Sequence, residues 1–99
     1  MAEKPEARVK RMIKAYLKST GAWFCMPIGG PYSTHGVPDI LACLGGRMIG
    51  IECKAFGKKS TVTPAQKDQL ARITDAGGVA ILADRVEDVK AALAEAGLP

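Results

Sequence analysis

Asp39, Glu52 and Lys54 are the residues of this chain whose types and spacing best suit chemistry on a phosphate group. Asp39 directly follows Pro38, and Glu52 and Lys54 are separated by a single residue. Carboxylates supply the oxygen ligands that Mg²⁺ prefers, and the backbone carbonyl of Cys53 can add another. An ammonium group beside them can orient water or stabilise negative charge that grows on phosphorus. The set therefore predicts a site for metal-assisted phosphodiester hydrolysis.

A glycine turn predicts that Asp39 and Glu52 meet. Gly45-Gly46 joins two apolar runs, residues 37–44 and 48–53, and such a pair is typical of a two-residue hairpin loop. In that register every opposed pair of positions sums to the same number, so Asp39 lies directly across from Glu52. Opposed residues stand roughly 4.5 to 5.5 Å apart at Cβ, and like charges there destabilise a sheet. A divalent cation would offset this repulsion.

Side chains alternate along a strand, so the hairpin is predicted to have one apolar and one reactive face. Lys54 shares the reactive face with Glu52, and Gly50 on the same face leaves room for a substrate beside the carboxylates. The opposite face carries apolar side chains: Ile40, Ala42, Leu44, Ile49 and Ile51.

These residues form a pattern that resembles a known nuclease motif. Pro38-Asp39, followed after a hairpin by Glu52-Cys53-Lys54, is similar to the PD-(D/E)xK motif. The surroundings resemble its virus-type replication-repair nuclease (VRR-NUC) branch in three stretches: residues 5–7 at the start of a first helix, residues 36–40, and residues 51–54 followed by Thr63-Pro64-Ala65-Gln66. The resemblance covers residues 6–93, which suggests one stand-alone VRR-NUC-like nuclease domain over residues 1–99.

The resemblance implies a role for each matched residue. Asp39 and Glu52 would bind Mg²⁺ or Mn²⁺, and Lys54 would be the catalytic lysine. Glu6 would lie at the edge of the metal site, and Gln66 would support the site from the second helix. The short members of this branch look like Holliday-junction resolvases, so the resemblance also implies a homodimer that cuts branched DNA.

The acidic residues also have simpler explanations. Asp39 and Glu52 could be solvated residues on an exposed sheet face, with Lys54 as their salt-bridge partner. Acidic residues in the first turn of a helix are favoured by the helix dipole, which would explain Glu6 without a metal. Glu3 is close enough in the sequence to take the place of Glu6.

Four further polar residues keep two explanations each. Gln66 fits the return arm of a capping box that starts at Thr63, whether or not it supports a site. His35, in the loop before the motif, could act near the scissile phosphate or be an exposed histidine without function. Lys58 and Lys59 could contact the DNA backbone or form a solvated basic fringe.

The three cysteines do not predict a zinc site or a disulfide framework. No pair among Cys25, Cys43 and Cys53 has the spacing of zinc ligands, and the hairpin register places Cys43 and Cys53 on opposite faces. An odd number of scattered cysteines is typical of reduced thiols, which fits a cytoplasmic setting.

The pattern of the chain predicts the elements that position these residues. Apolar spacing, capping residues and glycine punctuation indicate helices over residues 5–19, from residue 64 to Gly77, and from residue 84 or 85 to 96. Short apolar runs indicate strands over residues 22–27, 37–44, 48–53 and 79–83, the last suited to the interior of a sheet. The order α-β-β-β-α-β-α predicts a single-domain, restriction-endonuclease-like α/β fold with a mixed sheet of about four strands.

Composition narrows the classes of function. The net charge of +4 suits a polyanionic partner such as nucleic acid. No apolar run approaches the roughly 20 residues of a membrane span, and nothing resembles an export signal. The competing hypothesis is a DNA-binding or assembly module that keeps the fold but does not cut. A small-molecule hydrolase is disfavoured because the chain lacks a nucleophile motif and a phosphate-cradling glycine loop.

Overall fold

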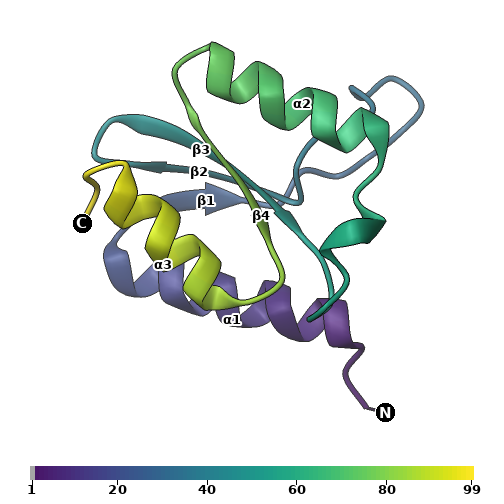
Figure 1. Cartoon of the computed structure of the whole chain (residues 1–99), viewed down its shortest axis with the longest axis horizontal. Coiled ribbons are helices and arrows are strands. Elements are labelled where there is room, and N and C mark those ends of the chain that lie inside the picture. The colour runs from purple at the N-terminus through teal and green to yellow at the C-terminus, as the bar shows by residue number, and fades with distance from the viewer. Residues whose placement is uncertain (1) are drawn as a thin grey trace.

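The computed structural model describes residues 2–99 as three layers, with a four-stranded sheet between helices (Figure 1). Helices α1 and α3 cover one face, and α2 lies on the other. The elements follow in the order α1 (Pro5–Thr20), β1 (Trp23–Cys25), β2 (Ile40–Leu44), β3 (Arg47–Cys53), α2 (Pro64–Asp75), β4 (Val79–Ala83) and α3 (Val86–Glu95), with a 3₁₀ turn at Lys59–Thr61 before α2. The predicted mixed α/β fold and its element order are confirmed.

The sheet has the strand order β1-β2-β3-β4, in which the first two pairings are antiparallel and the last is parallel. Gly45 and Gly46 form the predicted two-residue turn, and both have the positive φ, 58° and 77°, that such a turn requires. Leu44 pairs with Arg47 and Ile40 with Ile51, which is the register expected from the sequence.

The core lies between the sheet and the pair α1 and α3. Its strand residues are the apolar set predicted for one face of the hairpin, joined by Cys53, Ile81 and Ala83. The helices contribute residues at helical spacing: Val9, Ile13 and Leu17 from α1, and Val89 and Leu93 from α3. This packing fixes which face of β3 remains for polar side chains.

Helix ends follow the signals in the sequence. Pro5 occupies the start of α1, and Gly21, in the left-handed region at φ 80°, ends it. Thr63 caps α2 and forms the predicted capping box with Gln66. These ends set where Glu6 and Gln66 enter their helices.

Three local predictions were wrong. β4 is an edge strand and is only partly buried, because no strand lies beyond it. β2 begins at Ile40 rather than residue 37, since Pro38 cannot donate to a ladder. Leu70 and Ile73 of α2 are half-buried instead of buried, because α2 packs on the outer face of the sheet. None of the helices within residues 2–99 is long and apolar enough to cross a membrane.

Candidate active site

The open end of the β2-β3 hairpin brings Asp39 and Glu52 together. Asp39 directly precedes β2, and continuing the register one step beyond Ile40 and Ile51 sets it opposite Glu52. Its Oδ2 accepts a hydrogen bond of 2.9 Å from the backbone N–H of Cys53. The backbone of β3 thus holds the Asp39 carboxylate in place, as the hairpin register predicts.

Glu52 is a buried acid with polar neighbours. The residue is 2% exposed, and its Oε2 accepts a hydrogen bond of 3.2 Å from Nε2 of Gln66. The ammonium of Lys54, itself buried, lies 3.8 Å from the same oxygen. Lys54 and Glu52 therefore share one face of the strand end, which contradicts a solvated sheet surface for this pair.

Burial dominates the protonation of this acid. Burial raises the pKa of Glu52 to about 8. The hydrogen bond between Glu52 and Asp39 and the negative charge of Asp39 also raise this pKa. The positive charge of Lys54 lowers the pKa but does not offset burial. In the absence of a cation, burial and the neighbouring Asp39 therefore favour the protonated form of Glu52 at neutral pH.

Lys10 is a site residue that the sequence analysis missed. Its Nζ lies 3.6 Å from Oδ1 of Asp39 and 3.2 Å from Oε2 of Glu6. Burial opposes the charge on this lysine, but the charge of Asp39 and the contact with Glu6 outweigh it and raise the pKa of Lys10. The available signal was its position four residues after Glu6, which puts both on one face of α1.

Glu3 and Glu6 have different partners. Glu3 makes two hydrogen bonds, of 2.8 and 3.0 Å, to the guanidinium of Arg11 on the exposed surface of the N-terminal segment. Glu6 instead points to Lys10, and its charge contributes to the raised pKa of Glu52. Glu6 is therefore the acidic residue of α1 that borders the site.

Gln66 contacts both the cap of α2 and Glu52. Its Oε1 accepts a hydrogen bond of 2.9 Å from the backbone N–H of Thr63, which completes the capping box. Its Nε2 then points to Glu52. The cap orients the amide, so the first turn of α2 positions a donor for the buried acid.

The space predicted beside Gly50 is not open, which is a correction. A Cβ at Gly50 would lie 2.5 Å from Cδ1 of Ile73 and 3.2 Å from Cγ of Pro38. Gly50 therefore admits close packing of α2, not a substrate. Asp39 has a side chain that is 24% exposed, against 3% for Glu52, so a ligand would reach the acids from the side of Asp39 and α1.

Three loop residues were predicted near the site, and the structure gives each of them different surroundings. His35 is exposed and lines a hollow of about 290 Å³ formed by residues 27–37, and no hydrogen bond or ion pair joins it to Asp39 or Glu52 among the residues described. Lys59 is tied to Asp88 at 2.9 Å. Lys58 is exposed.

The side chains fit a divalent cation in type, although the cluster is incomplete. Within residues 2–99, no three acidic, histidine or cysteine side chains are arranged as a ready metal centre. Asp39 and Glu52 supply two carboxyl groups, and the third, Glu6, is held by Lys10. Oxygen donors of this kind suit Mg²⁺ or Mn²⁺, and a cation would compensate the buried acids.

The three cysteines differ in exposure. Cys25 and Cys43 are exposed and Cys53 is buried in the core, with all three thiols free. Burial raises the pKa of Cys53 to about 12, so this thiol stays protonated.

Comparisons with protein-family models, curated proteins and solved structures found no match for the chain. The candidate function therefore depends on the side chains themselves.

Proposed function

We propose that this protein is a metal-dependent endonuclease that hydrolyses phosphodiester bonds in branched DNA. The observation that supports it is the pair of opposed acids, Asp39 and Glu52, with the ammonium of Lys54 directed at Glu52 from the same strand end. Placing a partly exposed carboxylate beside the buried Glu52 is costly unless a cation or a proton compensates the pair. A catalytic metal site gives a reason to retain them.

Each side chain has a defined task in this proposal. Asp39, Glu52 and the Cys53 backbone carbonyl would hold Mg²⁺ or Mn²⁺, with Glu6 at the edge. The bound cation would polarise a phosphate oxygen and lower the pKa of a water. Lys54 orients the attacking water or stabilises charge on phosphorus, and Gln66 keeps Glu52 in its orientation.

Lys10 acts as the internal counterion when no metal is bound. It lies between Glu6 and Asp39, where it reduces the repulsion among the acids. Lys10 would be free to contact a substrate phosphate if Asp39 held a cation in place of this ammonium. Lys58 would add a backbone contact from the neighbouring loop, whereas Lys59 must first leave Asp88.

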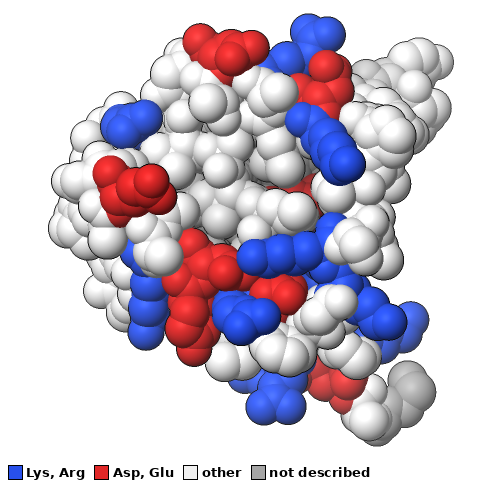
Figure 2. Space-filling view, in the orientation of Figure 1, with Lys and Arg blue, Asp and Glu red and all other residues white. Residues whose placement is uncertain are grey.

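The distribution of charge favours a small contact area with DNA. Basic and acidic side chains lie interspersed on the face shown in Figure 2, so the net charge of +4 does not form one broad basic surface there. A DNA molecule bound on this face would therefore make few phosphate contacts. Two protomers would be needed to hold the arms of a four-way junction.

An uncharged sheet face supports the homodimer. Trp23, Cys43 and Met48 form one cross-strand row on the outer face of the sheet, and all three are exposed. The row would form the contact between two copies.

The test is cleavage of labelled four-way, flap, hairpin and linear DNA with Mg²⁺, Mn²⁺ or a chelator. Asp39→Asn and Lys54→Ala should each slow cleavage by about a hundredfold or more. Lys18→Ala, an exposed lysine at the end of α1, is the matched control and should cleave as wild type does. Undiminished cleavage by both site variants would refute the proposal.

One observation favours a second candidate, a DNA-binding or assembly module that does not cut. Lys10 and Lys54 already compensate the acids without a metal, and the cluster lacks a third free carboxylate. Such a module would bind DNA equally well with a chelator. The melting temperature of such a module would not change with millimolar Mg²⁺ or Mn²⁺. It would not bind these ions, and a ligand stabilises only a native state that binds it.

A further inference from the structure

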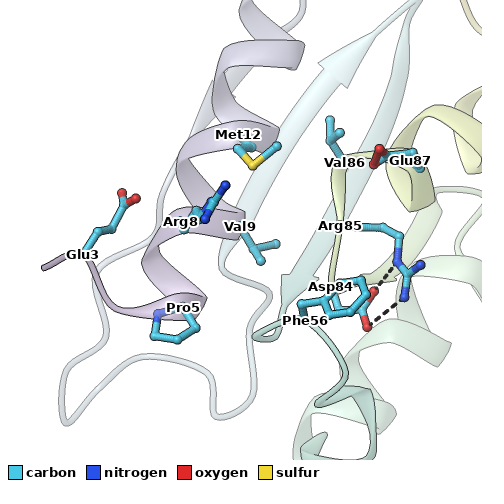
Figure 3. A pocket seen from close by; sticks show the side chains of 10 residues that line it. All are labelled: Glu3, Pro5, Arg8, Val9, Met12, Phe56, Asp84, Arg85, Val86 and Glu87. Atoms are coloured by element: carbon cyan, nitrogen blue, oxygen red, sulfur yellow. Dashed lines mark hydrogen bonds and ion pairs between the residues drawn. The ribbon is translucent and has the colours of Figure 1, made fainter.

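A groove separate from the acids lies between the N-terminal half of α1 and the segment that leads from β4 into α3 (Figure 3). Its volume is about 650 Å³, within the usual range for small-molecule sites. The side chains of Val9 and Met12 extend from α1 toward Val86 on the opposite wall, and Phe56 closes one end. The lining is thus apolar in its interior.

Phe56 is presented on a rigid support. The residue is 66% exposed, and the guanidinium of Arg85 lies 4.4 Å from the centre of its ring. Arg85 is held by Asp84 at 2.9 Å, and Asp84 also accepts a hydrogen bond of 2.9 Å from the backbone N–H of Gly57. These contacts hold the pKa of Asp84 well below its usual range. An aromatic ring covered by Arg85 on one face retains another face for stacking.

Charges in the groove largely cancel. Glu3 is paired with Arg11, and Asp84 is paired with Arg85. Within residues 2–99, Arg8 and Glu87 form no ion pair, so the two walls offer one cationic donor and one anionic acceptor. A bare phosphate gains little from such a balance. A flat neutral ring that both donates and accepts hydrogen bonds fits it.

Two residues that line the groove are close in the chain to residues of the candidate active site. Phe56 follows Lys54 by two residues, and Pro5 of the groove directly precedes Glu6. A DNA strand whose backbone lies at the acids can therefore place a neighbouring base here. This continuity favours part of the bound strand over an unrelated small molecule.

We propose that the groove binds an unpaired nucleobase of the DNA strand, stacked on Phe56 and hydrogen-bonded by Arg8 and Glu87. The identity of the ligand as DNA rests on the proposed function. The groove would make the protein select DNA with an unstacked base next to the bond that is cut, as at junctions and flaps. Base stacking on an aromatic side chain is sequence-tolerant, so the selection is for structure.

The experiment measures binding of a short single-stranded deoxyoligonucleotide in chelator, where no cleavage occurs, with 2-aminopurine fluorescence as the signal for stacking. Phe56→Ala should weaken binding on the order of tenfold to a hundredfold. Phe56→Trp should restore it. Tyr32→Ala removes a more exposed aromatic ring outside the groove and should leave binding unchanged. An oligonucleotide with an abasic position should bind wild type more weakly.

Two results would overturn the proposal that the groove binds a nucleobase. One is wild-type affinity in Phe56→Ala with no change in 2-aminopurine emission. The other is an equal loss of binding affinity in Phe56→Ala and Tyr32→Ala. The outcomes separate the two proposals. Binding that depends on Phe56 without any cleavage by wild type would refute the nuclease and retain the groove. Metal-dependent cleavage together with binding that does not depend on Phe56 would retain the nuclease proposal and refute the groove as a nucleobase site.

Discussion

Gln66 donates a hydrogen bond of 3.2 Å from Nε2 to Oε2 of Glu52, and its other amide atom completes the cap of α2. One side chain therefore links a helix start to a buried acid. The link implies that the stability of α2 and the orientation of Glu52 can be separated by mutation, since Thr63 serves the cap alone.

Gln66→Ala and Thr63→Ala form a matched pair that tests this link. Both variants lose part of the capping box, so each should be less stable by about 0.5 to 2 kcal/mol. Gln66→Ala also removes the donor to Glu52 and should slow metal-dependent cleavage beyond the effect of Thr63→Ala. Melting temperatures and cleavage rates measure the two effects. Equal rates in both variants would contradict a positioning role.

The stability of the metal-free protein should fall as pH rises through neutrality. Glu52 has a pKa raised from 4.5 to about 8, so between these values the folded chain holds a proton that the unfolded chain releases. Its contribution is fully present below pH 4.5 and is lost as pH approaches 8, with a slope of at most about 1.4 kcal/mol per pH unit.

Denaturant unfolding at a series of pH values, compared between wild type and Glu52→Gln, isolates this contribution. The difference in unfolding free energy between the two should change across that window and level off above it. Metal binding should strengthen toward pH 8, because a cation binds the ionised acid. A difference that stays constant with pH would contradict the raised pKa.

Asp39→Asn and Asp39→Ala should differ in stability. Loss of the Asp39 charge relieves repulsion only where Glu52 is ionised, and Asp39 also accepts a hydrogen bond from the backbone N–H of Cys53. Alanine leaves that donor unpaired and should cost about 1 to 3 kcal/mol, whereas asparagine retains an acceptor. Thermal unfolding in chelator measures this. Neither variant should gain stability from Mn²⁺, and a wild-type gain in either would exclude Asp39 as a ligand.

Met48→Lys should convert the proposed dimer to a monomer. Met48 is 42% exposed in the uncharged row on the outer sheet face, where a buried lysine is costly. Met12→Lys is the matched control, because Met12 is 40% exposed but lies on α1. Light scattering gives the mass, and the emission of Trp23, the single tryptophan, should shift to the red on dissociation. A wild-type monomer would exclude the contact.

Local signals in the sequence determined the scaffold of this protein. Gly45 and Gly46 predict the turn, the alternation that follows predicts the buried face, and Thr63 with Gln66 predicts the start of α2. From the turn alone it follows that Asp39 opposes Glu52, because hairpin register depends on loop length. The turn, the buried face and the helix start each depend on residues that are close in the chain or that pair across one turn.

Tertiary structure alone decided what surrounds the two acids. Lys10 reaches Asp39, Ile73 fills the space at Gly50, and Asp84 fastens the loop after Lys54, each across a separation that no local pattern encodes. The edge position of β4 and the groove beside Phe56 belong to the same class. The physical reason is that the burial and the electrostatic environment of a side chain depend on which helix packs on which face of the sheet. That packing is determined by all the core residues together.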